Sequence, residues 1–147
     1  MWEALEATAL AQHLRASTYS YPLVNALHIV GLALLLGGIT PVDLRLLGLW
    51  RGIPLEPLIR TARRTAAFGL VLALAMGLLL FSVRASEYAM HPAFQIKLVL
   101  ILAALANAAF GEHAHRRHEA GRLRVHAGLS LGLWLAVILA GRAIAYF

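Results

Sequence analysis

The amino-acid sequence predicts an all-α protein, an integral membrane four-helix bundle that forms a single domain over residues 1–147. Four apolar stretches are each long enough to cross a bilayer, since a hydrocarbon core of ~30 Å needs ~20 apolar residues in a helix. The composition agrees, with 61% hydrophobic and only 14% charged residues and a mean hydropathy of +0.74. Backbone groups in hydrocarbon must pair within their own segment, so each stretch is expected to be a helix.

The predicted elements follow in chain order. Residues 2–15 are amphipathic and are expected to form a short helix on the outer surface of the membrane. The loop after the first span carries three prolines and is expected to hold only a short amphipathic helix, and residues 84–92 are expected to form a short outer turn. The four spans are predicted at residues 22–39, 65–83, 93–110 and 125–147.

The distribution of positive charge predicts the orientation. The net charge is +6, and nine of the thirteen Lys and Arg residues lie in the two loops on one side, which we expect to be cytoplasmic, with both termini on the periplasmic side. Membrane topology explains the basic pI, so no nucleic-acid partner is predicted, and the expected location is the bacterial inner membrane. The nine residues are Arg45, Arg51, Arg60, Arg63, Arg64, Arg116, Arg117, Arg122 and Arg124.

His28 is the first candidate functional residue, because an ionisable side chain inside a span is costly unless it is paired or functional. It lies about seven residues inside the first span, ~10 Å deep at 1.5 Å per residue. A haem or metal ligand is one interpretation, and a neutral imidazole hydrogen-bonded to a neighbouring helix is the other. Met76 on the second span lies at the same depth and is a candidate second ligand for haem or copper, or a packing residue.

Three basic residues lie closer to the outer surface than His28, namely Lys97, Arg142 and Arg84. Their long stems can lie in lipid while the charges reach the headgroups. The alternative is a cationic ring that binds anionic groups such as haem propionates. Faces of Gly and Ala on the second and fourth spans either permit close helix packing or leave room for a flat cofactor.

The cytoplasmic half offers a second set of polar residues. His113 and His126 flank the second cytoplasmic loop at similar depth, so they either ligate an inner haem or are solvated. Asn107 is expected to be buried in the third span, with Ser130 on the fourth. Asp43 and its neighbour Arg45 are expected to tie the end of the first span to other elements.

Five segments together resemble a family of small bacterial four-helix membrane proteins of unknown function, over nearly the whole chain from Ser17. The layout is more distantly similar to the copper-resistance membrane domain and to small b-type cytochromes. The chain departs from the family at Gly111, where members often carry a histidine, which weighs against a second inner ligand. The matching segments are YPLVNALHIVGLALLLGG, VDLRLLG, GLLLF, AFQIKLVLILAALANAAF and SLGLWLAVILAGRAIAYF.

The leading hypothesis is therefore a membrane haem b protein in electron transfer, with His28 as an axial ligand, Lys97 and Arg142 at the propionates, and quinone as a redox partner. Copper binding or transport through His28 and Met76 is one alternative. The other is a non-catalytic subunit that packs in a homo-oligomer or a larger membrane complex. No nucleophile–base arrangement is recognised, so no catalytic residue is predicted, and the absence of cysteine excludes thiolate metal sites and iron–sulfur clusters.

Overall fold

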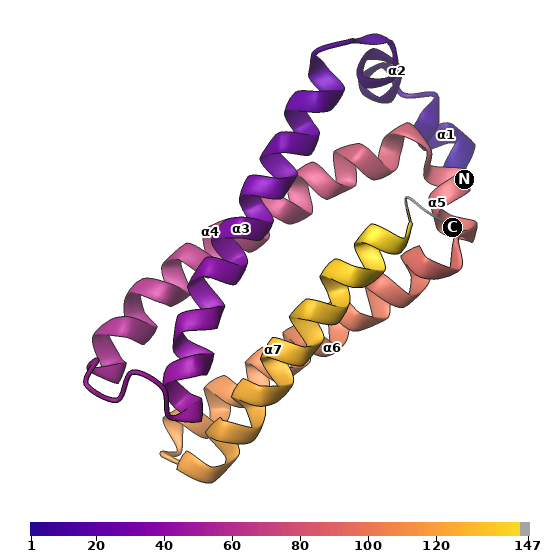
Figure 1. Cartoon of the computed structure of the whole chain (residues 1–147). Helices are drawn as coiled ribbons and strands as arrows, with labels where there is room; N and C mark the ends of the chain where they lie inside the picture. The colour runs from indigo at the N-terminus through magenta and orange to yellow at the C-terminus, as the bar shows by residue number, and fades with distance from the viewer. Residues whose placement is uncertain (145–147) are drawn as a thin grey trace.

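The computed structural model describes residues 1–144 and is all-helical over that range. Four long apolar helices pack together, which confirms the predicted helical bundle (Figure 1). Each is long and apolar enough to cross a membrane, so the chain has the features of a multi-pass membrane protein. The four are α3 (Ser20–Leu47), α4 (Leu55–Val83), α6 (Pro92–Arg116) and α7 (Ala120–Ala143).

The first two long helices extend well past the predicted spans into the proline-containing loop. α3 continues through Pro41 to Leu47, and α4 already begins at Leu55, so the separate short helix expected after Ile39 is absent from this segment. A proline inside a helix costs one hydrogen bond and a contact with the preceding turn, and the packing of α3 on its neighbours outweighs that cost. α3 ends at Gly48, whose φ of +106° suits glycine.

Three short helices cover the opposite end of the bundle: α1 (Trp2–Glu6), α2 (Ala9–Ala16) and α5 (Ala85–Met90). The amphipathic segment 2–15 is thus two helices rather than one. The break occurs because the Thr8 hydroxyl accepts a hydrogen bond from the backbone N–H of Ala11 and caps α2. The expected outer turn at 84–92 contains α5. The last three residues of the predicted fourth span, 145–147, lie outside the described residues.

α3 and α4 pack at backbone contact. A Cβ atom added at Gly31 would lie 2.5 Å from the backbone nitrogen of Ala73, and one added at Gly38 would lie 2.7 Å from the backbone oxygen of Ala62. Gly69 of α4 is equally close to the backbone of Leu35. Glycine is required at these positions because no side chain fits between the two helices. Such close approach maximises van der Waals contact, which drives helix association where lipid surrounds the protein.

The bundle consists of two helical hairpins that meet along one seam. α3 packs on α4, α6 packs on α7, and the hairpins join through α3 and α7, whereas α4 and α6 make no direct backbone approach over residues 1–144. The small core at the seam contains Leu35, Ala104, Trp134 and Val137. Large apolar side chains such as Phe68 remain exposed around the bundle, as expected for surfaces that face lipid.

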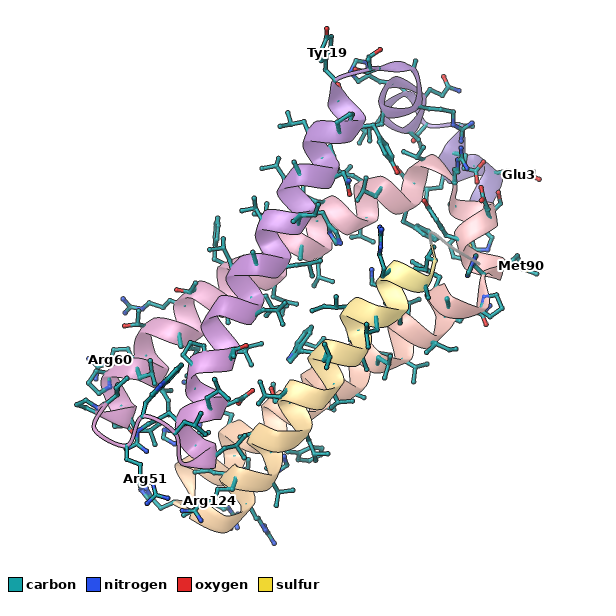
Figure 2. All side chains as sticks on the ribbon, in the orientation of Figure 1. Glu3, Tyr19, Arg51, Arg60, Met90 and Arg124 are labelled. Atoms are coloured by element: carbon teal, nitrogen blue, oxygen red, sulfur yellow. The ribbon has the colours of Figure 1, made fainter. Side chains whose placement is uncertain are left out.

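The charged loops lie at one end of the molecule, as Figure 2 shows for Arg51, Arg60 and Arg124. We call this the basic end; it comprises the loop 48–54, the connection 117–119 and the adjoining helix turns. The opposite end, marked in the figure by Glu3, Tyr19 and Met90, contains α1, α2, α5 and the last described turn of α7. We call it the terminal end. Both predicted cytoplasmic loops therefore lie together.

At the terminal end, the N-terminal helices are held to α4 and α5 by specific contacts. The ring of Trp2 packs edge-on against Phe81 at 5.5 Å. Glu6 accepts hydrogen bonds from the hydroxyl and the backbone N–H of Ser86, at 2.6 and 2.7 Å. Arg15 donates to the carbonyl of Val83, one of the last carbonyls of α4 that lack a partner within the helix. These contacts fix α1 and α2 over the end of the bundle.

Gly31→Ala should destabilise the protein, because the added methyl group meets the backbone of Ala73. Overpacking of this kind costs about 1–3 kcal/mol. The matched control is Gly37→Ala on the same helix, where a Cβ meets nothing within 4 Å. Thermal unfolding in detergent, followed by circular dichroism, should show a lower Tm for Gly31→Ala and an unchanged or higher Tm for Gly37→Ala. Equal values for the two variants would contradict the proposed contact.

The docking of α1 should depend on pH. Hydrogen bonds from Ser86, assisted by the Arg15 charge, lower the pKa of Glu6 below its ordinary value of 4.5. Because the folded pKa is lowered, the stabilisation is present above the ordinary value and is lost as pH falls through the lowered one. The emission of Trp2, taken as the difference from Trp2→Phe, should shift as the pH is lowered past about 4.5. Glu6→Gln should abolish this shift, and a shift that persists in that variant would exclude Glu6 as its cause.

Candidate functional site

His28 lies on the face of α3 that contacts α4, at the terminal half of the bundle. Its Nδ1 is 2.8 Å from the backbone oxygen of Ala73, and its Cε1 would lie 3.1 Å from a Cβ added at Gly77. A carbonyl oxygen can only accept, so Nδ1 carries the proton and donates. The imidazole is therefore the tautomer with a lone pair on Nε2. Among residues 1–144 no partner for Nε2 is present.

Lys97 of α6 lies close enough to His28 for the two side chains to interact electrostatically. Its stem lies over α7, where the amine nitrogen is 3.3 Å from the position of a Cβ added at Gly141. Within the described helices no acceptor pairs with this amine. The terminal half therefore brings together an imidazole with an open Nε2 and an unpaired ammonium group, which come from different hairpins.

The other residues predicted around His28 are placed less closely. Met76 lies one helical turn after Ala73 on α4, so it shares the face that His28 contacts. Arg84 is exposed and pairs with Glu87 at 3.4 Å. Arg142, near the end of α7, is also exposed. Of the three basic residues expected to form a ring, Lys97 approaches the histidine.

The two faces of small residues differ in what covers them. The α4 face, formed by Gly69, Ala73 and Gly77, is occupied by α3, so it serves close helix packing and leaves no room for a flat cofactor. On α7, nothing lies within 4 Å of a Cβ added at Gly132. That face is open at this position in the single chain.

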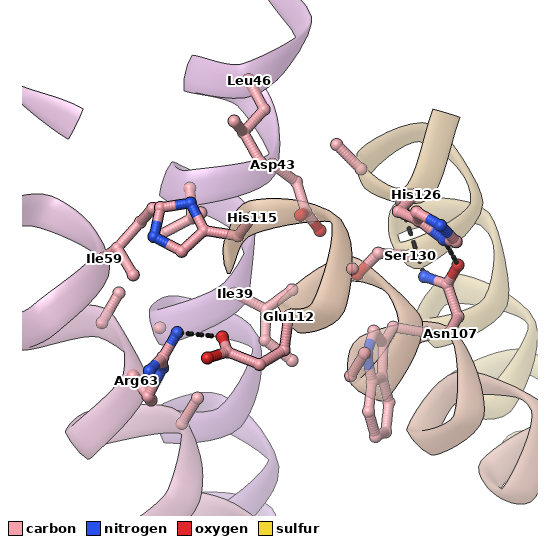
Figure 3. A pocket seen from close by; sticks show the side chains of 18 of the residues that line it. Ile39, Asp43, Leu46, Ile59, Arg63, Asn107, Glu112, His115, His126 and Ser130 are labelled. Carbon is pink, nitrogen blue, oxygen red and sulfur yellow. Dashed lines mark hydrogen bonds and ion pairs between the residues drawn. The ribbon is translucent and has the colours of Figure 1, made fainter. Parts of the chain in front are cut away.

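A second site lies at the basic end. A cavity of about 310 Å³ opens between the halves of α3, α4, α6 and α7 nearest the charged loops. Its wall is mostly apolar, as is typical of small-molecule sites, which also carry a few placed polar groups. We call it the basic-end cavity (Figure 3). Its ionisable and amide side chains are Asp43, Arg63, Asn107, Glu112, His115 and His126, with the hydroxyl of Ser130.

Asp43 is the buried acid of this cavity. Only 7% of the residue is exposed, and its Oδ2 atom has no hydrogen-bond partner within residues 1–144. The carboxyl group points toward the side chain of Ser130 of α7 (Figure 3). The predicted tie between helix end and loop is made by Arg45 alone, which donates to the carbonyls of Ile53 and Arg51. Asp43 faces the cavity instead.

Charged pairs bridge α4 and α6, the two helices that do not pack directly. Arg63 of α4 forms an ion pair with Glu112 of α6, which also accepts from Arg116 at 2.8 Å. His115 lies 3.4 Å from Glu56 at the start of α4. Figure 3 shows the Arg63–Glu112 pair on the opposite side of the cavity from Ser130 and His126. These bridges close the side of the cavity between α4 and α6.

Asn107 and His126 form a reciprocal pair between α6 and α7. The Asn107 amide donates to the backbone oxygen of His126 at 2.9 Å, and His126 Nδ1 donates to Asn107 Oδ1 at 2.8 Å. The burial predicted for Asn107 is confirmed, at 8% exposure. His113 is exposed and lies on a different face of α6 from Asn107 and Gly111, which face His126. The structure thus does not bring His113 and His126 together.

No protein-family model, no curated protein and no solved structure matches this chain. The functional assignment therefore depends on the geometry of the two sites.

Replacing Asn107 should weaken the α6–α7 hairpin. Asn107→Ala leaves the ring and the backbone carbonyl of His126 without their partner, and a buried group left unpaired costs about 1–3 kcal/mol. The control is the same substitution at Asn25, which is exposed on α3. Thermal unfolding should show a clearly lower Tm for Asn107→Ala and little change in Tm for Asn25→Ala. Equal stability of the two variants would mean that the reciprocal pair contributes nothing.

Proposed function

We propose that the protein binds haem b in the membrane and acts in electron transfer. The observation that supports this most is the hydrogen bond from His28 Nδ1 to the Ala73 carbonyl. Histidines that ligate metals commonly donate their other ring N–H to a carbonyl or carboxylate, which fixes the tautomer and the ring orientation. His28 is held in that way, and its Nε2 is available as an axial ligand.

Lys97 supports haem over a bare copper ion. Its ammonium group lies near His28 and has no counter-ion among the described residues. A positive charge at this position repels a metal cation but attracts the carboxylates of haem propionates.

Haem would supply a reversible one-electron couple, whose potential its axial ligands set. His28 would hold the iron, and Lys97 would bind a propionate. Met76 is the candidate second ligand within the chain, and a second copy of the chain in a homo-oligomer could supply one instead. Quinone in the bilayer is the redox partner that this placement would suit.

The positive-inside rule supports an orientation for this site. The nine arginines of the basic end would face the cytoplasm, and the terminal end would face the periplasm if the membrane is a bacterial inner membrane. His28 would then lie in the periplasmic half of the bilayer.

An absorption spectrum of the purified protein, oxidised and then reduced with dithionite, tests this proposal. Protein made with ample haem should show a Soret band and sharp reduced α and β bands. His28→Ala should abolish them, and Lys97→Ala should weaken haem retention, while the control His113→Ala, at an exposed position, should change neither. A featureless spectrum would refute haem binding. Copper found by elemental analysis would then favour the copper alternative, and metal-free protein would favour a packing subunit.

A further inference from the structure

We propose that the basic-end cavity is a binding site for a neutral, membrane-soluble molecule with a phenolic hydroxyl group, of the hydroquinone class. The site is separate from His28: Asp43 follows it by fifteen residues on the same helix, about 22 Å along the axis at 1.5 Å per residue. The inference therefore holds whether or not the chain binds haem.

The unpaired oxygen of Asp43 indicates what the ligand must offer. A buried carboxylate oxygen without a partner is costly, and buried polar groups in native proteins nearly always have one. Oδ2 of Asp43 is buried, lacks a partner within residues 1–144, and belongs to a side chain that points into the cavity. In the ionised carboxylate, only a hydrogen-bond donor or a cation can satisfy this oxygen.

The side chains that line the basic-end cavity are unsuited to binding an ion. Calcium needs six to eight oxygen ligands, and magnesium needs near-ideal octahedral oxygen geometry. Here Asp43 and Ser130 lie together, but the oxygen of Asn107 is already bonded to His126, and Arg63 contributes a positive charge to the same cavity. An anion is disfavoured by the carboxylates of Asp43 and Glu112. The remaining choice is a neutral molecule with a donor group.

The volume of the cavity and the residues that line it narrow the class of ligand further. A volume of about 310 Å³ is at the lower end of the range for small-molecule sites. Apolar side chains make up most of the wall, and the indole of Trp134 is among them. Helices α4 and α6 do not pack against each other, so this side of the cavity is bridged by side chains rather than by backbone contact. A compact aromatic ring that dissolves in lipid fits these features, with its hydroxyl group donating to Asp43.

Trp134 provides a reporter of binding. It is the only tryptophan of the three that lines the cavity, since Trp2 lies at the terminal end and Trp50 in the loop after α3. A protein with Trp2→Phe and Trp50→Phe therefore emits from the site alone. The probe is trimethylhydroquinone, kept reduced under anaerobic conditions. Its dimethyl ether has the same ring but no donor, and it also controls for absorption by the ligand.

Trimethylhydroquinone should change the Trp134 emission saturably, and the dimethyl ether should bind at least about ten-fold more weakly, since hydrogen bonds to charged groups carry that much affinity. Asp43→Leu, checked for folding by circular dichroism, should lower the affinity for the hydroquinone by a similar factor and leave that for the ether unchanged. Asp43→Asn, which keeps the shape of the side chain and one acceptor oxygen, should lose less affinity for the hydroquinone than Asp43→Leu does. The control Glu87→Gln, which removes a carboxylate at the terminal end, should bind as the parent does.

Three results would overturn the proposal. They are the absence of saturable binding, equal binding of the hydroquinone and its ether, and undiminished binding by both Asp43 variants. Equal binding of the two ligands would identify an apolar cavity without donor recognition. If Asp43→Leu does not fold, Asp43→Asn alone decides, because it removes the charge and changes no volume.

Discussion

The backbone contact between α3 and α4 is the constraint on which the rest of the structure depends. In lipid, helices gain little from burying apolar side chains, so close contact between their backbones must hold them together. Gly31, Gly38 and Gly69 permit this contact. The same contact sets the register of the two helices, and the register places the ring of His28 at the carbonyl of Ala73. The candidate haem ligand is therefore oriented by helix packing and not by a neighbouring polar side chain.

The second hairpin contributes side chains to both sites, but it packs on the first hairpin less closely than α4 packs on α3. It meets the first at the seam of α3 and α7, and its contribution near His28 is the Lys97 side chain. At the basic end it supplies Ser130, Asn107 and Glu112 to the cavity. Polar groups within the bundle are mostly satisfied by each other, as Asn107 and His126 illustrate, because little water reaches them. Oδ2 of Asp43 lacks such a partner within residues 1–144.

The sequence predicted the four long helices and the grouping of the basic loops because hydropathy and charge are properties of the chain itself. Helix ends were less predictable: the prolines suggested a loop, but Pro41 is accommodated within α3 because the helix is packed on both sides. The partner of His28 is a backbone carbonyl, which every residue carries, so no pattern could indicate it. Asp43 was assigned to a structural tie because its burial in the cavity depends on α7, and the residues of that helix lie almost ninety positions away in the chain. Glu112 and Arg63 were missed for the same reason.

The division into two hairpins has a consequence for how the molecule is assembled. The contacts within each hairpin join neighbouring segments of the chain. The seam, in contrast, joins α3 to α7, which are separated by most of the length of the chain. Local contacts form faster than distant ones, since less chain entropy is lost in closing short loops. Each hairpin can thus form as it enters the bilayer, and the seam closes last. A nascent chain that has inserted only α3 and α4 already holds His28 in place, but it has no basic-end cavity. The cavity needs side chains from all four long helices.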